Sequence, residues 1–147
     1  MSLHASSSSK CVPCSGLDES AKLSAEEAQV ELSSLPHPSS LWSLKESQEG
    51  ILSLSRKFTA RNFKVALDAI NEIGAIAEKE NHHPDLHLTN YRDVEVVIYT
   101  HKVNGLTQND FVLAAKINRK VTIDYSPKWL RENPDAVSTS RKKEESE

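Results

Sequence analysis

The stretch ARNFKVALDAINEIGAIAEKENHHP, residues 60–84, decides how this chain folds. Its apolar side chains recur every three or four residues, which lays one apolar stripe along a helix of about five turns. The stripe consists of Phe63, Leu67, Ile70, Ile73 and Ala77. Because a proline forces the residue before it into an extended conformation, Pro84 predicts that the helix ends before the pair His82–His83. The histidine pair is therefore expected where a long helix gives way to a strand.

Two pairs of strands are predicted around this helix. Upstream, the apolar segments 41–44 and 51–58 flank a Glu-Gly turn signal. Downstream, residues 86–88 and 94–98 alternate between apolar and polar, as half-buried strands do. Side chains at alternate positions share a face, so Tyr99 and His101 are expected on one face and Thr100 on the other.

Two further helices complete the pattern. Ser24 with Glu27 has the spacing of a capping box and predicts a helix to about Leu35, and Thr107 with Asp110 predicts the start of the last helix. The element order is then α-β-β-α-β-β-α. We expect an α+β fold with a single four-stranded antiparallel sheet and helices packed on one face.

Composition divides the 147 residues into three parts. Residues 1–20 are rich in serine and are predicted to be a disordered tail, residues 21–123 a single domain, and residues 124–147 a largely flexible extension. Cys11 and Cys14 form a lone CxxC, which is more simply two reduced thiols than half of a metal site. The first residues have neither an apolar core nor an arginine, which favours a cytoplasmic location, with import into a mitochondrion or plastid left open.

The charge balance limits the classes of partner. A formal net charge of -3 provides no basic field for phosphates, so nucleic acid is not expected as a direct ligand. No apolar run approaches the roughly 20 residues needed to cross a bilayer, so no membrane association is expected. The exposed edges of the predicted sheet favour a homodimer or homotetramer.

Three of the six histidines, His82, His83 and His101, fall at the predicted helix and strand boundaries. Imidazole can give and take a proton near neutral pH, so histidines in one cleft suggest acid–base catalysis. Three histidines with a carboxylate could instead bind a metal ion. Neighbouring side chains such as His82 and His83 diverge in an extended chain, which makes that site awkward, so no metal is predicted.

The complete set of residues resembles the pterin-4a-carbinolamine dehydratase family. The matching positions are Glu78, His82, His83, Pro84, Tyr91, Thr100, His101, Gly105, Leu106, Thr107 and Asp110, in the family's order and spacing. The resemblance implies dehydration of 4a-hydroxytetrahydrobiopterin to quinonoid dihydropterin, a step of tetrahydropterin recycling, by histidine acid–base catalysis. It also implies that the pterin is the substrate and that no cofactor is needed.

The resemblance implies roles for individual residues. His82, His83 and His101 would be catalytic, with His82 and His101 favoured for proton transfer and neither assigned as acid or base. The residues expected to contact or order the substrate are Glu78, Asn81, Pro84, Tyr99, Thr100 and Asp110. The alternative is a non-catalytic binding module, because animal members of the family serve as dimerisation cofactors for a homeodomain transcription factor.

Overall fold

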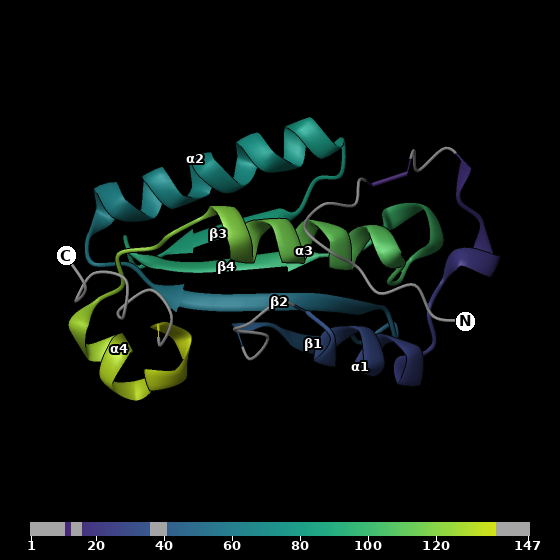
Figure 1. Cartoon of the computed structure of the whole chain (residues 1–147), viewed down its shortest axis with the longest axis horizontal. Coiled ribbons are helices and arrows are strands. Elements are labelled where there is room, and N and C mark those ends of the chain that lie inside the picture. Colours follow the sequence, from purple (N-terminus) through teal and green to yellow (C-terminus); the bar gives the residue numbers. More distant parts are fainter. Residues whose placement is uncertain (1–10, 13–15, 36–40, 138–147) are drawn as a thin grey trace.

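The computed structural model describes residues 11–12, 16–35 and 41–137, so Cys14 of the CxxC pair lies outside the described residues. Within these ranges the chain forms a four-stranded antiparallel sheet in the spatial order β1-β2-β4-β3 (Figure 1). The strands are β1 Ser43–Glu46, β2 Leu52–Thr59, β3 Asp85–Thr89 and β4 Asp93–Ile98. The helices are α1 Ala25–Ser33, α2 Phe63–Glu80, α3 Gln108–Lys120 and α4 Pro127–Glu132. Single turns of 3-10 helix span Glu19–Ala21, His101–Val103 and Pro134–Val137.

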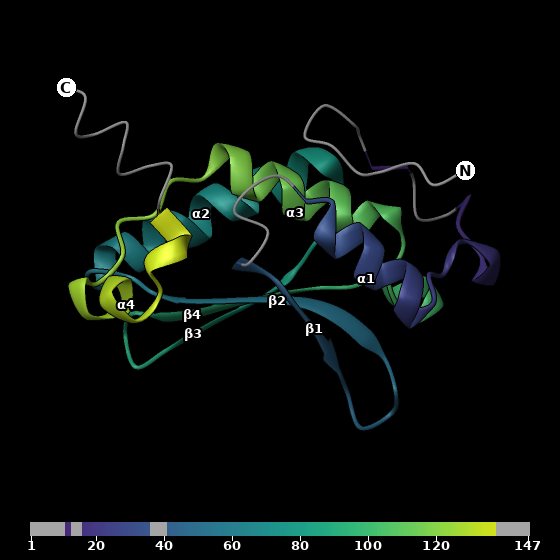
Figure 2. The ribbon, with the colours of Figure 1, turned by 60° about the horizontal axis from the view of Figure 1, so that its bottom comes forward.

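The predicted fold class is confirmed. Helices α1, α2 and α3 lie on the same side of the sheet, and the other side is left uncovered by them (Figure 2). β2 pairs with β4 in the middle of the sheet, and β3 forms one edge. Three residues, Asn90 to Arg92, join β3 to β4, and Asn90 and Tyr91 both have positive φ, which is uncommon for residues other than glycine.

The core lies between the sheet and these helices. Alternate residues of β2 and β4 point into it, and the middle of α3 is buried on all sides. The sheet-facing side chains of α2 are Ala66, Ala69, Ile73 and Ala77. Phe63 and Leu67, which the apolar stripe placed inward, are 49% and 38% exposed. The predicted stripe was drawn mainly from large apolar side chains. The face that packs on the sheet consists mostly of alanines, because small side chains let the helix approach the sheet closely.

Both predicted capping boxes are confirmed. At the start of α1, the Glu27 backbone N–H donates to Oγ of Ser24 at 3.1 Å and the Ser24 N–H donates to Oε1 of Glu27 at 2.9 Å. At the start of α3, the Thr107 N–H donates to Oδ2 of Asp110 at 2.8 Å. These reciprocal bonds satisfy backbone donors that have no partner within the helix. They fix where α1 and α3 begin.

The segment after α3 carries an element for which the sequence analysis assigned none. The Ser126 side chain accepts from the Trp129 N–H at 3.0 Å, and Pro127 occupies the first turn, which together start α4. The Ser126 N–H donates to the Thr59 carbonyl at 2.9 Å, which ties α4 to the end of β2. None of the described helices combines the length and apolar character needed to span a bilayer.

Candidate active site

The end of α2 directs two neighbouring histidines to opposite sides. Asn81 caps the helix in the left-handed conformation, with φ of 52°, and the His82 N–H donates back to the Ala77 carbonyl at 3.1 Å. The backbone then becomes extended, so successive side chains point in opposite directions. The side chain of His82 is only 4% exposed, and that of His83 is 56% exposed.

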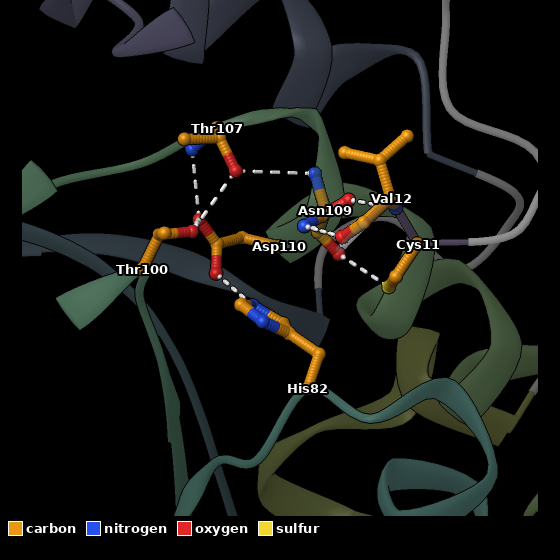
Figure 3. A network of polar contacts seen from close by, with 7 residues as sticks. All are labelled: Cys11, Val12, His82, Thr100, Thr107, Asn109 and Asp110. Carbon is orange, nitrogen blue, oxygen red and sulfur yellow. Dashed lines mark hydrogen bonds and ion pairs between the residues drawn. The ribbon is translucent and has the colours of Figure 1, made fainter. Parts of the chain in front are cut away.

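His82 points inward onto a buried carboxylate. Its Nε2 lies 2.6 Å from Oδ1 of Asp110, whose side chain is fully buried (Figure 3). The other oxygen of Asp110, Oδ2, accepts from the Thr107 N–H and, at 2.9 Å, from the Thr100 hydroxyl. A carboxylate only accepts hydrogen bonds, so His82 must carry a proton on Nε2 and donate it. Asp110 therefore fixes both the orientation of the His82 ring and its proton.

Thr100 joins this network to the end of β4. Its backbone pairs with Gly105, closing a short loop that contains His101 and Asn104. The Thr100 hydroxyl has one proton and gives it to Asp110, so the Thr107 hydroxyl donates in the 2.9 Å contact between the two threonine oxygens. Every polar atom named in this corner has a partner, which makes the corner a rigid support.

His101 begins the 3-10 turn His101–Val103, beyond the end of β4, and it is exposed whereas Thr100 is buried, which agrees with the opposite faces predicted for them. Its ring packs against the Tyr99 ring, with centroids 4.1 Å apart and planes inclined by 34°. The side chain is exposed. Tyr99 therefore limits the positions that the His101 ring can take, and the stacked face of the imidazole is protected from water.

His83 is oriented by a carboxylate on α2. Its Nε2 lies 2.8 Å from Oε2 of Glu78, one of the residues expected to contact or order the substrate. Glu78 precedes His83 by one turn of helix and the capping residue. Because Glu78 occupies Nε2, the ring nitrogen that can face a ligand is Nδ1. The pair is solvent-exposed, so its main effect is orientation.

A cavity of about 280 Å³ lies at this corner of the molecule. The predicted site residues that line it are Asn81, His82, His83, Pro84 and His101. The others stand behind them: Glu78 contacts His83, Tyr99 stacks on His101, and Thr100 and Asp110 support His82. The structure thus brings two exposed imidazoles, His83 from the segment after α2 and His101 from the 3-10 turn after β4, to one cavity.

Two lining residues were missed by the sequence reasoning, Asp85 and Lys102. Each directly follows a predicted site residue, Pro84 and His101, and that adjacency was the only available signal. Lys102 brings positive charge to the cavity rim. Hydrogen bonds from Ser20 hold the pKa of the exposed Asp18 carboxyl below its usual value, and the charge of Lys102 adds to this effect. The rim of the cavity itself carries one acidic group, Asp85, and one basic group, Lys102.

A larger cavity, of about 530 Å³, opens elsewhere. It is lined by Lys57, Phe58, Thr59, His87, Thr89, Asp93, Val94, Glu95 and Trp129. Burial raises the pKa of Glu95, but hydrogen bonds from Ser55 and Lys45 and the nearby lysine charges outweigh burial and hold that pKa below its usual value. Among the described residues, His87 is the only imidazole in this lining. Acid–base chemistry that needs two imidazoles thus favours the smaller cavity. In the described part of the chain, no three His, Cys, Asp or Glu side chains are placed to hold a metal ion.

Comparisons with known proteins agree with the geometry. A family model described as pterin 4 alpha carbinolamine dehydratase matches residues 21–120. Pterin-4-alpha-carbinolamine dehydratase 2, mitochondrial, from Arabidopsis thaliana is 41% identical over 112 residues, which cover 76% of this chain and 57% of that protein. A Rickettsia canadensis protein whose name includes the same dehydratase activity is 42% identical over 115 residues, covering 78% of this chain and 96% of that protein.

Solved structures include a similar fold. The crystal structure of a transcriptional coactivator/pterin dehydratase from Brucella melitensis has a TM-score of 0.55 and 28% sequence identity, and the match covers 67% of this chain and 96% of that chain. The matched family region contains both histidine-bearing segments and Asp110. The chain belongs to the pterin 4 alpha carbinolamine dehydratase family, which confirms the family and the enzyme class, a dehydratase, that its spaced histidines predicted.

Proposed function

We propose that this protein removes water from 4a-hydroxytetrahydrobiopterin, or a closely related pterin, and releases quinonoid dihydropterin. The observation that carries the proposal is the cavity between His83 and His101, two exposed imidazoles that come from different elements. The family match names the pterin. In the cell the reaction would return an oxidised pterin to the recycling of the tetrahydro form.

The reaction needs one proton donor and one proton acceptor. The bond between carbon 4a and its hydroxyl oxygen breaks, and an imidazolium protonates the departing hydroxide to give water. The bonding electrons are replaced when a pterin ring nitrogen loses its proton to a neutral imidazole. The two histidines then return to their starting charges by exchanging protons with solvent. No electrons are gained or lost by the protein, so the proposal includes no cofactor.

We assign the proton transfers to His83 and His101. This assignment differs from the sequence-based preference for His82, because the His82 ring is buried and its Nε2 is engaged by Asp110. His82 lines the cavity, and we propose that it orients the pterin ring. Glu78 and Tyr99 hold His83 and His101 in position. Catalysis would then depend on proton transfer by His83 and His101 and on His82 as a fixed hydrogen-bonding group.

Stopped-flow absorbance of freshly generated 4a-hydroxytetrahydropterin tests the activity. We expect the purified, chelator-treated protein to accelerate the appearance of quinonoid dihydropterin over the spontaneous rate. Acceleration that disappears with the chelator and returns with added metal would point to metal-assisted chemistry instead. A rate equal to the spontaneous one would refute the dehydratase proposal.

The proposed assembly is a homodimer or homotetramer in the cytoplasm. Two surfaces support self-association: β3 is an edge strand, and the exposed side chains of Phe63 and Leu67 lie on α2. The name of the Brucella protein includes a coactivator role. The same surfaces would serve a binding module, which is the second candidate function.

A further inference from the structure

The segment Cys11–Val12, called the strap here, lies upstream of the matched family region. It is nevertheless bound beside the contact between His82 and Asp110. The Val12 N–H donates to Oδ1 of Asn109 at 2.8 Å, and Nδ2 of Asn109 donates to the Val12 carbonyl at 2.9 Å. The Cys11 thiol also lies 3.5 Å from the Asn109 carbonyl (Figure 3). The Asn109 side chain thus makes two hydrogen bonds to the backbone of Val12, as a neighbouring strand would.

The strap also contacts the end of α2. The Cys11 N–H donates to Oε1 of Glu80 at 3.0 Å, and Nζ of Lys116 lies 2.6 Å from Oε2 of the same carboxylate. The side chains of Glu80 and Lys116 are only 5% and 7% exposed. A buried carboxylate needs several donors to remain charged, and the strap supplies one of them. The strap is therefore part of a satisfied polar network.

The two anchor points belong to the elements that carry the His82–Asp110 contact. Glu80 is the last residue of α2, two positions before His82. Asn109 directly precedes Asp110, and its N–H donates to Oγ1 of Thr107 at 3.3 Å. The strap therefore bridges the end of α2 and the start of α3 at the point where His82 and Asp110 meet. Figure 3 shows the continuous chain of contacts from Val12 to His82.

We propose that the strap is a positioning element for the dehydration, with Asn109 as its anchor. The proposal rests on the proposed function, because it concerns how His82 is held for that reaction. Val12 is 53% exposed, so within the strap only the partly buried Cys11 packs against the core. Its contribution is a set of hydrogen bonds to buried polar groups. Losing them should loosen the His82–Asp110 corner more than it destabilises the core.

The variant Val12→Pro in the full chain removes the Val12 N–H and with it the bond to Asn109. Its matched control is Val12→Ala, which trims the exposed side chain but keeps the N–H. We expect Val12→Pro to lower kcat roughly three- to ten-fold with KM nearly unchanged, less than the about 10²-fold that a 1 Å misplacement can cost. Val12→Ala should match the unchanged protein.

A double-mutant cycle connects the effect to the anchor. Asn109→Ala removes the other side of the same contact, so Val12→Pro should cost almost nothing further in the Asn109→Ala background. Rates are compared well below the unfolding midpoint of each variant. If the two losses in rate multiply, the strap does not act through Asn109 and the proposal is wrong.

The ring signals of His82 in NMR spectra provide a readout that does not depend on activity. Val12→Pro should shift or broaden them, and Val12→Ala should not. Unchanged His82 signals in Val12→Pro would overturn the proposal, and so would changed signals with an unchanged kcat. If the unchanged protein fails to accelerate dehydration, the proposed function fails by itself. The His82 signals then still decide whether the strap positions that ring.

Discussion

Replacing His83 by alanine should lower the turnover of pterin dehydration by about 10²-fold or more, the usual contribution of a general acid–base group. The side chain is exposed at the cavity, and Glu78 holds its Nε2 so that Nδ1 can reach a ligand. Folding should be unaffected, because the side chain contributes no core packing. The measurement is stopped-flow dehydration at saturating substrate, with thermal unfolding recorded in parallel.

His87→Ala is the matched control for this experiment. His87 is also exposed, lies four residues away on β3, and lines the larger cavity rather than the smaller one. It should retain the unchanged rate. Glu78→Gln should have a smaller effect than His83→Ala, since it weakens the orientation of the imidazole without removing it. Equal rates for His83→Ala and His87→Ala would show that His83 transfers no proton in the reaction.

Replacing Asp110 by asparagine should damage both stability and catalysis. The new amide keeps the shape of the side chain but can no longer accept at both oxygen positions. If its oxygen keeps the bonds from Thr100 and Thr107, its NH₂ faces the Nε2–H of His82, donor against donor. Leaving a buried hydrogen-bond donor without an acceptor typically costs about 1–3 kcal/mol. We expect a lower free energy of unfolding by that order and a lower kcat.

Asp85→Asn separates this effect from the loss of any carboxylate near the cavity. Asp85 is exposed at the rim, so its substitution should change the free energy of unfolding by less than about 0.5 kcal/mol. Urea unfolding of both variants provides the comparison. An Asp110→Asn protein as stable and as active as Asp85→Asn would mean that the His82–Asp110 contact supports neither fold nor catalysis.

Local signals explain why most of the fold could be predicted. Capping boxes at Ser24 and Thr107, and the strand alternation that separates Thr100 from His101, depend on residues close in sequence. The buried face of α2 was predicted only in part, because periodicity cannot tell whether a large or a small side chain faces a close sheet. Serine followed by proline at Ser126-Pro127 is a helix-start pattern, so the beginning of α4 could also have been predicted.

Spacing alone could not predict that His82 is buried and His83 is exposed. It depends on the left-handed cap at Asn81 and on Asp110, which is 28 residues from His82 in sequence. The strap was equally hidden, because hydrogen bonds between a backbone segment and a buried side chain leave no periodic pattern. Family resemblance predicted which residues form the site, whereas burial indicates which of them can reach a ligand.

The proposed site requires that a pterin bind between His83 and His101. Histidine ring signals followed by NMR, while a stable dihydropterin is titrated into the unchanged protein, test this most directly. The signals of His83 and His101 should shift together and saturate, while those of His87 stay in place. Saturable shifts at His87, with none at His83 and His101, would place the ligand on the open face of the sheet and refute the proposed site.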